Sequence, residues 1–351
     1  MAAFRVALSS DFRNPDGSPT YPTFDLSPLI SDPSIEIGYV AAEGGVMPGS
    51  ALADYDALIL VVPLFSRQSI PANRRLGLVA RFGVGFDNVD LDACNEAGIA
   101  VVTTPHGIRR PLAVAIITFI LALTSKLMVK DRLTRQGPDG FNQRASHMGV
   151  GLMGRVLGSV GIGNIGAEMF RLAKPFDMRY IAHDPYASAE VAKELGVELV
   201  DLETVFRISD IVTLNCPLTA ETRHIVNART LRLMKPSAYL INTARGPVVD
   251  QVALTDALEK GLIAGAGLDV FDTEPPPADE PILRLDNVIV APHSLCWTDQ
   301  CFAGTGAADI KAVLDFRQGV VPASVVNRAV LATNVWMQRL TAQQNSSAKS
   351  G

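Results

Sequence analysis

The chain has 351 residues, of which 48% are hydrophobic, and its formal net charge is -5. This length provides enough apolar surface for two domains with separate cores, and the composition excludes an intrinsically disordered chain. The weakly acidic balance, without a dense block of lysine or arginine, offers no electrostatic basis for binding nucleic acid or an anionic membrane. We therefore expect a globular protein with neither of these partners.

Cysteines and apolar runs indicate the compartment. The cysteines are scattered without a C-x-x-C pair, at Cys94, Cys216, Cys296 and Cys301, so neither a disulfide framework nor a metal site is indicated. The first residues lack the basic region and long apolar stretch of a signal peptide. The apolar run at 111–123 is shorter than the roughly 20 residues of a membrane span and predicts a buried helix. We expect a cytoplasmic protein.

Two series of short apolar segments follow one another along the chain. The first predicts strands at 5–8, 57–62, 78–80 and 99–102. After the helix at 111–126, the second predicts strands at 156–160, 179–182, 211–214, 238–241, 265–268 and 288–290. Strands that alternate with helices in this way are typical of parallel α/β layers, and the second series matches a complete dinucleotide-binding domain.

A glycine motif joins the first strand of the second series to a helix at 167–174. It contains Gly161, Gly163, Asn164, Ile165 and Gly166. Glycines allow a tight turn and a close backbone approach to a pyrophosphate, and the helix N-terminus adds partial positive charge. Asp184 ends the next strand, where its carboxylate can accept hydrogen bonds from a ribose and would repel a 2′-phosphate. Pro185 and not arginine follows, so the motif favours NAD over NADP.

The central position of this motif predicts an inserted domain. We expect an NAD-binding Rossmann domain at 104–296 within a flavodoxin-like substrate domain formed by 1–103 and 297–335, each a doubly wound parallel sheet. A helix at 298–319 would return the chain to the first domain. Residues 336–351 are predicted to form a tail, because the last ten residues are polar and lack an apolar face.

Candidate acid–base groups lie where strands of the second series end. His293 directly follows the strand at 288–290, and His106 is its closest rival. The lone histidines His147, His183 and His224 are expected to be structural. Arg245, beyond the strand at 238–241, can hold a carboxylate with two parallel hydrogen bonds, although a surface ion pair is the alternative. Either Glu274 or Asp272 could orient the histidine ring.

In the first domain, Val84 and Gly85 lie in a glycine turn whose backbone N–H groups suit an anion, and an ordinary tight turn is the alternative interpretation.

Several motifs in order resemble those of the D-isomer-specific 2-hydroxyacid dehydrogenases. They are Arg-Phe-Gly-Val-Gly-Phe-Asp-Asn-Val-Asp from residue 81, the glycine motif, Cys-Pro-Leu-Thr from 216, Asn-Thr-Ala-Arg-Gly from 242, Gly-Leu-Asp-Val-Phe-Asp-Thr-Glu-Pro from 267 and Ala-Pro-His-Ser from 291. The resemblance implies a homodimer through the cofactor domain and a catalytic set of Arg245, Glu274 and His293. It assigns the orienting role to Glu274, because the family's acid precedes a proline.

The resemblance also implies ligand contacts. NAD is expected to contact Gly161, Gly163, Asn164, Ile165, Gly166, Asp184, Pro185, Cys216, Pro217, Thr222, Thr243, Ala244, Arg245, Asp269 and His293. Substrate is expected to contact Val84, Gly85, Arg245, His293 and Trp297. The segment at 295–300 departs from the family pattern, because it carries the bulky Trp297 where small residues are common.

The implied reaction is hydride transfer between C2 of a small 2-hydroxy acid or 2-keto acid and NAD, with His293 exchanging the hydroxyl proton. Substrates of the glyoxylate, hydroxypyruvate, phosphoglycerate or sugar-acid type all remain open, and arginines at 74, 75, 81, 109 and 110 could favour a phosphorylated acid or simply be solvated. The alternatives are formate or phosphite oxidation on the same fold and an NADH-sensing regulatory protein.

Overall fold

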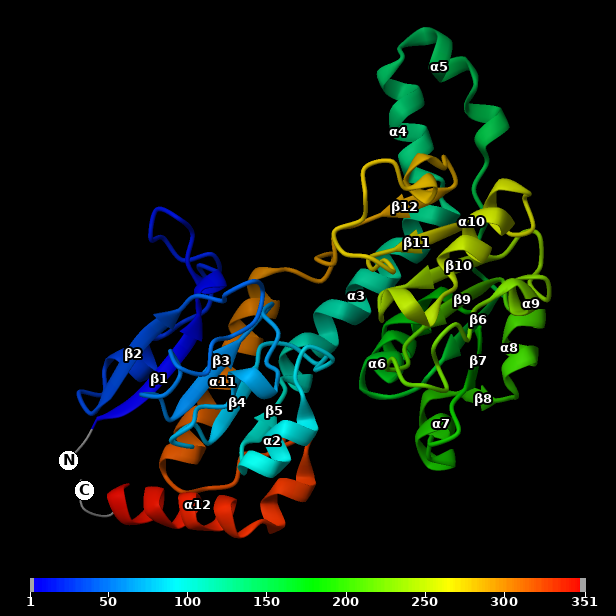
Figure 1. Ribbon diagram of the computed structural model, residues 1–351. Helices are drawn as coiled ribbons and strands as arrows, with labels where there is room; N and C mark the ends of the chain where they lie inside the picture. The colour runs from blue at the N-terminus through cyan, green and yellow to red at the C-terminus, as the bar shows by residue number, and fades with distance from the viewer. Residues whose placement is uncertain (1–2, 348–351) are drawn as a thin grey trace. The chain divides into compact units, whose positions relative to one another are not determined.

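The structure, a computed structural model, describes residues 3–347. The chain divides into two compact units, and Figure 1 shows a sheet with flanking helices in each. Unit 1 comprises Met1–Ile108 and Thr298–Gly351, and unit 2 comprises Arg109–Trp297. The division therefore lies a few residues beyond the predicted boundary near 104 and one residue beyond that at 296.

Unit 1 contains a parallel five-stranded sheet in the order β2-β1-β3-β4-β5. Its strands are β1 (Phe4–Ser9), β2 (Ile35–Val40), β3 (Ala57–Leu60), β4 (Leu78–Arg81) and β5 (Ala100–Val102). This order is that of flavodoxin-like doubly wound folds, which confirms the predicted fold class. The strand β2 is absent from the prediction because this edge strand is only partly buried and shows weak apolar alternation.

The helices of unit 1 are α1 (Ser27–Ile30), α2 (Leu91–Ala97), α11 (Asp299–Arg317) and α12 (Asn334–Ser347), with short 3₁₀ turns at η1 (Ser10–Phe12), η2 (Arg67–Ser69) and η7 (Arg328–Ala332). The carboxylate of Asp90 accepts the Ala93 N–H and caps α2, and Gly98 ends that helix with a left-handed φ of 66°. The Thr298 hydroxyl caps α11 in the same way. The predicted helix at 298–319 is thus present.

The predicted tail at 336–351 is wrong as far as residue 347, because α12 (Asn334–Ser347) covers that part of the chain (Figure 1). Trp336 is only 1% exposed and stacks on Phe316 of α11, with ring centroids 5.4 Å apart. Arg339 donates to the carbonyl oxygens of Ala97, Gly98 and Arg74, and so covers the exposed carbonyls at the end of α2. A few anchoring contacts therefore order a segment whose average composition is polar.

Unit 2 contains a parallel seven-stranded sheet in the order β12-β11-β10-β9-β6-β7-β8. Its strands are β6 (Val156–Val160), β7 (Arg179–His183), β8 (Val197–Leu199), β9 (Ile211–Leu214), β10 (Tyr239–Asn242), β11 (Gly265–Leu268) and β12 (Val288–Val290). From β8 to β11 this is the Rossmann order, with β12 added at the edge. The prediction omitted β8, a short edge strand with two exposed residues.

Unit 2 also contains most of the helices. They are α3 (Pro105–Thr124), which begins in unit 1, α4 (Leu127–Arg135), α5 (Pro138–Asn142), α6 (Asn164–Ala173), α7 (Ala189–Leu195), α8 (Leu202–Ile208), α9 (Ala228–Leu231) and α10 (Gln251–Glu259). The 3₁₀ turns are η3 (Arg144–His147), η4 (Lys174–Phe176), η5 (Gly246–Val248) and η6 (Pro281–Arg284).

Helix α3 packs on the sheet of unit 2. It has the length and apolar composition of a membrane span, and half of that stretch is buried inside the structure. Phe119 and Ile120 are buried in one hydrophobic cluster with β6 and β10. A Cβ on Gly267 of β11 would lie 2.8 Å from the Phe119 ring, so a glycine is needed for this close approach. The apolar run therefore forms a core helix.

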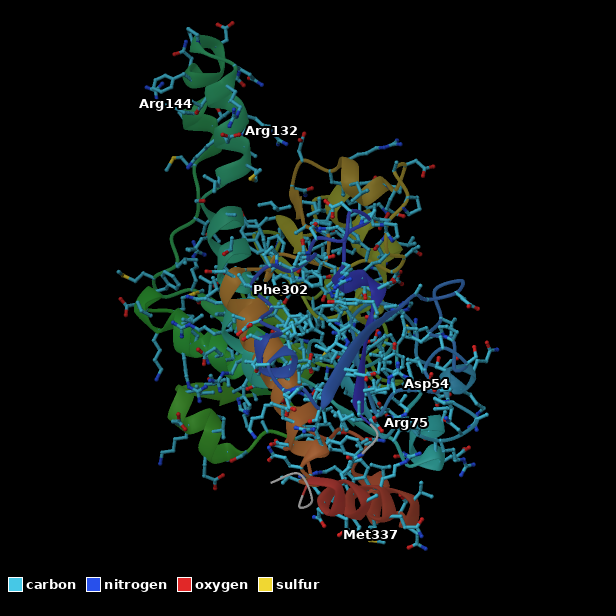
Figure 2. The ribbon with its side chains drawn as sticks, turned by 90° about the vertical axis from the view of Figure 1, so that its left-hand side faces the viewer. Asp54, Arg75, Arg132, Arg144, Phe302 and Met337 are labelled. Atoms are coloured by element: carbon cyan, nitrogen blue, oxygen red, sulfur yellow. The ribbon has the colours of Figure 1, made fainter. Side chains whose placement is uncertain are left out.

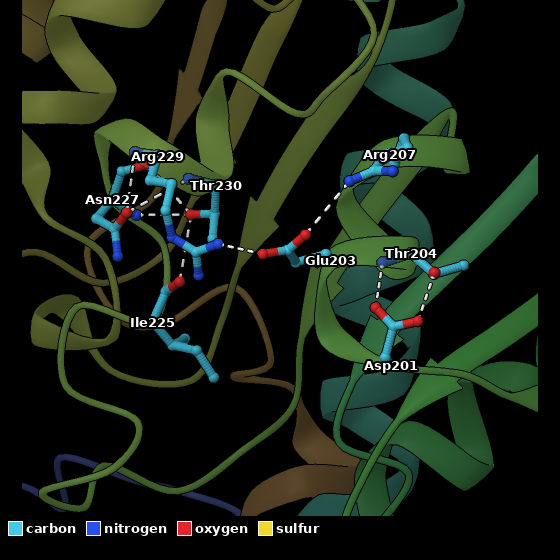
Figure 3. A network of polar contacts seen from close by, with 8 residues as sticks. All are labelled: Asp201, Glu203, Thr204, Arg207, Ile225, Asn227, Arg229 and Thr230. Carbon is cyan, nitrogen blue, oxygen red and sulfur yellow. Dashed lines mark hydrogen bonds and ion pairs between the residues drawn. The ribbon is translucent and has the colours of Figure 1, made fainter.

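Polar side chains fix where α8 and α9 begin (Figure 3). Asp201 accepts the Thr204 N–H at 2.9 Å, and the Asn227 side chain accepts the Arg229 N–H at 3.0 Å. Glu203 forms ion pairs with Arg207 and Arg229 and so links the two helices. Because these charges are exposed, the ion pairs contribute little stability, whereas the caps satisfy backbone donors.

Trp336→Ala should reduce the free energy of unfolding by roughly 3 to 5 kcal/mol, because it leaves a cavity between α12 and α11. The matched control is Met337→Ala, at a neighbouring side chain of α12 that is 47% exposed (Figure 2). Urea unfolding followed by far-UV circular dichroism measures both. Equal, small effects of the two substitutions would show that α12 is not part of the cooperative fold of unit 1.

Candidate active site

The candidate site lies along one edge of the unit 2 sheet. Because all strands are parallel, their carboxyl ends open at the same edge, and the chain order reverses between β6 and β9. Ligands of doubly wound sheets lie at such a reversal. The predicted residues occupy the turns that follow β6, β7, β9, β10, β11 and β12.

The glycine turn after β6 has the geometry of a dinucleotide cradle. Gly161 has a left-handed φ of 97°, and a Cβ there would lie 2.7 Å from the Asn215 carbonyl oxygen. A Cβ on Gly166 would lie 2.7 Å from the Gly161 carbonyl oxygen, so Gly166 lets α6 approach the turn. Gly163 precedes α6 and has open space where a Cβ would be. These residues therefore fit a pyrophosphate held at the N-terminus of α6.

Asp184 is held against this turn. Its carboxylate oxygens accept the N–H groups of Ile162 and Tyr186, each at 2.9 Å. Pro185 and Tyr186 lie beyond it, with the Tyr186 side chain exposed. The carboxylate thus lies at the end of β7 with lone pairs left for the hydroxyl groups of a ribose.

The turn after β9 contains Cys216 and Pro217. Thr222 braces it, because its hydroxyl donates to the Pro217 carbonyl at 2.6 Å and accepts the Thr219 N–H at 2.7 Å. Burial raises the pKa of the Cys216 thiol to about 11, so this thiol stays neutral and is not a nucleophile. The sequence analysis missed Asn215, whose amide donates to the Ser159 hydroxyl at 2.8 Å and ties this turn to β6.

The turn after β10 presents Thr243, Ala244 and Arg245. Asn242 shapes it, because its side chain accepts the Ala244 N–H and donates to the Arg245 carbonyl. A Cβ on the following Gly246 would lie 1.9 Å from the Phe271 carbonyl oxygen. Glycine at 246 therefore brings the Arg245 turn against the segment that leads to Glu274.

Glu274 and His293 form the central pair of the site. The Glu274 Oε2 atom lies 2.7 Å from His293 Nδ1, and Oε1 accepts the Phe271 N–H at 2.9 Å. Burial raises the pKa of Glu274, but its hydrogen bonds from His293 and Phe271 and the nearby Arg245 charge lower it by more, so the carboxylate stays ionised. His293 has a left-handed φ of 53°, a strained conformation of the kind concentrated at functional sites.

Asp272 does not share this position. Its N–H donates to the Gln251 side chain, and burial, partly offset by the charges of His224 and Arg223, raises the pKa of its carboxyl group. The structure therefore places Glu274, and not Asp272, beside His293.

Asp269 anchors the segment that carries His293. Its buried carboxylate accepts the N–H groups of Ser294 at 2.9 Å and Leu295 at 3.2 Å. Burial raises the pKa of Asp269, and these two hydrogen bonds offset part of that effect. Asp269, predicted as a cofactor contact, thus also fixes the backbone after His293, a role that the sequence did not reveal.

The remaining predicted residues lie elsewhere. Trp297 is exposed at the end of unit 2, and its N–H donates to the Ser294 carbonyl at 2.8 Å. Val84 and Gly85 belong to unit 1, as does His106. His183 contacts the Val200 carbonyl oxygen at 3.2 Å. Within residues 3–347, no group of three or more histidine, cysteine or acidic side chains could hold a metal ion.

The chain is similar to proteins of a known family. Residues 117–294 match the family described as D-isomer specific 2-hydroxyacid dehydrogenase, NAD binding domain. A glyoxylate reductase of Korarchaeum cryptofilum is 39% identical over 79% of this chain and 84% of its own length. A D-3-phosphoglycerate dehydrogenase of Methanocaldococcus jannaschii is 37% identical over 83% of this chain and 56% of its own length.

A solved structure of similar fold is the D-lactate dehydrogenase of Aquifex aeolicus in complex with NAD and lactic acid. It is 30% identical, has a TM-score of 0.75, and the alignment covers 90% of this chain and 96% of that one.

Asp184→Ala should narrow the preference for NADH over NADPH, because it removes both the ribose acceptor and the charge that repels a 2′-phosphate. Asp184→Asn keeps a hydrogen-bond acceptor without the charge. It should raise the affinity for NADPH and lower the affinity for NADH less than Asp184→Ala does. Fluorescence titration of the wild type and both variants with NADH and with NADPH measures the affinities. Unchanged selectivity in both variants would contradict the assignment of Asp184.

Proposed function

Because the chain belongs to the D-isomer-specific 2-hydroxyacid dehydrogenase family and is an NAD-dependent oxidoreductase of CH–OH groups, we propose that it interconverts a small 2-hydroxy acid and its 2-keto acid with His293 as the acid–base group. The observation that carries the proposal is the 2.7 Å contact between Glu274 and His293 at the same sheet edge as the glycine turn. A histidine paired in this way can give and take a proton at a carbonyl oxygen.

The chemistry divides between the cofactor and the chain. Bound NADH supplies the hydride for C2 of the keto acid. His293 donates a proton to the developing alkoxide from Nε2, because Nδ1 faces Glu274. The ionised Glu274 orients the ring and stabilises its cation, and the Phe271 N–H keeps that carboxylate in place. In the oxidation direction the proton moves back to His293.

Arg245 is proposed to hold the substrate carboxylate and to polarise the carbonyl group. Its position in a turn braced by Asn242 and packed closely on Phe271 supports this role, because a rigid turn fixes the direction of the guanidinium. Val84 and Gly85 of unit 1 and Trp297 are proposed to complete the substrate site. This part of the proposal rests on the family motifs alone.

The Glu274–His293 pair separates this proposal from formate oxidation on the same fold. Formate loses a hydride to become CO2 without any proton transfer, so that reaction offers no reason for a histidine braced by a carboxylate. Phosphite oxidation needs a base for the attacking water, so turnover of a keto acid is what separates it from the proposed reaction.

The test of the acid–base pair is the pH profile of kcat/KM for keto acid reduction. Reduction requires the His293 cation, so the rate should fall at alkaline pH. Glu274→Gln removes the stabilising charge and should move this fall to lower pH, whereas His293→Ala should reduce activity roughly 100-fold or more at every pH. The control is Asp272→Asn, two residues away and not in contact with the ring. An unshifted alkaline limb in Glu274→Gln would refute the pairing.

We further propose a cytoplasmic homodimer formed through unit 2. Cys94 and Cys216 are free thiols, as expected in a reducing compartment. Helices α4 and α5 project from the rest of unit 2, and Figure 2 labels Arg132 and Arg144 on this projection. The projection and its return segment expose Leu127, Met128, Phe141, Met148 and Met153. A concentration of exposed apolar side chains of this kind marks an interaction surface.

Phe141→Glu combined with Met148→Glu should convert the dimer to a monomer, because these side chains, 56% and 75% exposed, would carry charge into the interface. Analytical ultracentrifugation measures the mass. The control is Met337→Glu, an exposed apolar residue of unit 1. A monomeric wild-type protein, or an unaffected dimer in the double variant, would contradict the proposed interface.

A further inference from the structure

The carboxyl edge of the unit 1 sheet bears on the identity of the substrate. In the order β2-β1-β3-β4-β5 the chain reverses between β1 and β3, so the turns after β1, β3 and β4 lie where such sheets hold ligands. The turn after β4 contains Val84 and Gly85. The inference rests on the proposed function, because it takes Val84 and Gly85 to contact the substrate.

These turns are fixed against one another. The Asn88 side chain donates to the carbonyl groups of Val61 at 3.2 Å and Pro63 at 3.0 Å, and the Phe65 N–H donates to the Asn88 carbonyl at 2.8 Å. The Val62 N–H donates to the Asp11 carboxylate at 2.9 Å. The turn after β3 is therefore tied both to the turn after β4 and to the turn after β1, and its side chains are held in place.

The turns after β3 and β4 expose apolar side chains. Val62 is 68% exposed, and Leu64 and Phe86 are also exposed. In the same unit, Tyr21 stacks on Phe302 with ring centroids 4.4 Å apart and on Phe82, which follows β4, with centroids 5.9 Å apart. A surface that is held rigid by polar contacts and yet exposes apolar side chains favours an apolar ligand group.

Several of the arginines that could meet a phosphate are engaged with other groups. No lysine occurs before residue 126. Arg5 pairs with Glu36 and Asp54, Arg67 with Glu96, and Arg75 with Asp56, while Arg13 lies over the Tyr39 ring. Figure 2 shows Arg75 and Asp54 on the same side of unit 1, away from Phe302. In unit 2, Arg109 and Arg110 face the buried Glu168.

Arg81 lies at the end of β4, and the negative charge of Asp11 counters its positive charge near Tyr21. Burial raises the pKa of the Tyr21 hydroxyl to about 12, and both the Asp11 carboxylate and the Arg81 guanidinium lie close enough to influence it in opposite directions. Arg81 also donates to the Phe82 carbonyl. A phosphate dianion at this edge would therefore meet one positive and one negative group beside an apolar surface.

We propose that the substrate is a 2-keto acid whose C3 substituent is uncharged and apolar, either branched aliphatic or aromatic. The substituent would lie against Val62, Leu64 and Phe86, where burial of apolar surface is favourable and a phosphate or a chain of hydroxyl groups would lose water without gaining partners. This proposal narrows the range of substrates left open by the sequence, because it disfavours phosphoglycerate and sugar acids.

The first test compares kcat/KM with NADH for 4-methyl-2-oxopentanoate, phenylpyruvate, hydroxypyruvate, 3-phosphohydroxypyruvate and glyoxylate. The two apolar acids should exceed the phosphorylated one by about 100-fold and hydroxypyruvate by about 10-fold. A preference for 3-phosphohydroxypyruvate, for hydroxypyruvate or for glyoxylate, which has no C3 substituent, would overturn this inference and leave the proposed function standing. A lack of turnover with every keto acid would overturn the proposed function, and this inference with it.

The second test locates the specificity on the turn after β3. Val62→Arg should raise the kcat/KM ratio of 3-phosphohydroxypyruvate to 4-methyl-2-oxopentanoate by about 10-fold or more, because it adds a cation and removes apolar surface. Ile30→Arg is the control, since Ile30 is 67% exposed in the same unit but lies at the end of α1, before β2 begins. An unchanged ratio in Val62→Arg, or equal changes in both variants, would overturn the placement of the substituent.

Discussion

The parallel direction of all strands is the constraint on which the site depends. A parallel pair needs a crossover connection, so every carboxyl end of the unit 2 sheet faces the same edge, however far apart the strands lie in sequence. Asp184, Arg245 and His293 each follow a different strand and reach that edge for this reason. In unit 1 the same constraint gathers the turns after β1, β3 and β4, and the turns after β3 and β4 expose the apolar side chains that favour an apolar substrate.

Close backbone approach then decides which turns can meet. Gly161 lets the glycine turn after β6 approach the Asn215 carbonyl, and Gly166 lets α6 approach the same turn. A Cβ at either position would prevent this packing. Gly246 does the same for the Arg245 turn and the Phe271 carbonyl. These glycines act at different points of one edge, so the cofactor cradle and the acid–base pair share a single rigid support.

Two carboxylates near His293, those of Glu274 and Asp269, have different roles because their hydrogen-bond partners differ. Glu274 receives a hydrogen bond from the His293 ring as well as one from the Phe271 N–H, and its pKa is lowered despite burial. Asp269 receives N–H groups of the chain, and burial keeps its pKa raised. Glu274 is therefore suited to stabilise the His293 cation, whereas Asp269 holds the chain segment that carries His293.

Features that are local in the chain follow from the sequence alone, because strand, turn and helix signals lie within a few residues of one another. They are the glycine turn between β6 and α6, Asp184 at the end of β7, and His293 after β12. It could not distinguish Glu274 from Asp272 as the neighbour of His293 without the family motif, since the choice depends on how a loop folds back across the sheet. It also missed β2, β8 and α12, whose order comes from pairing at a sheet edge or from a few buried anchors such as Trp336. These points depend on contacts between residues distant in the chain, which outweigh local composition there.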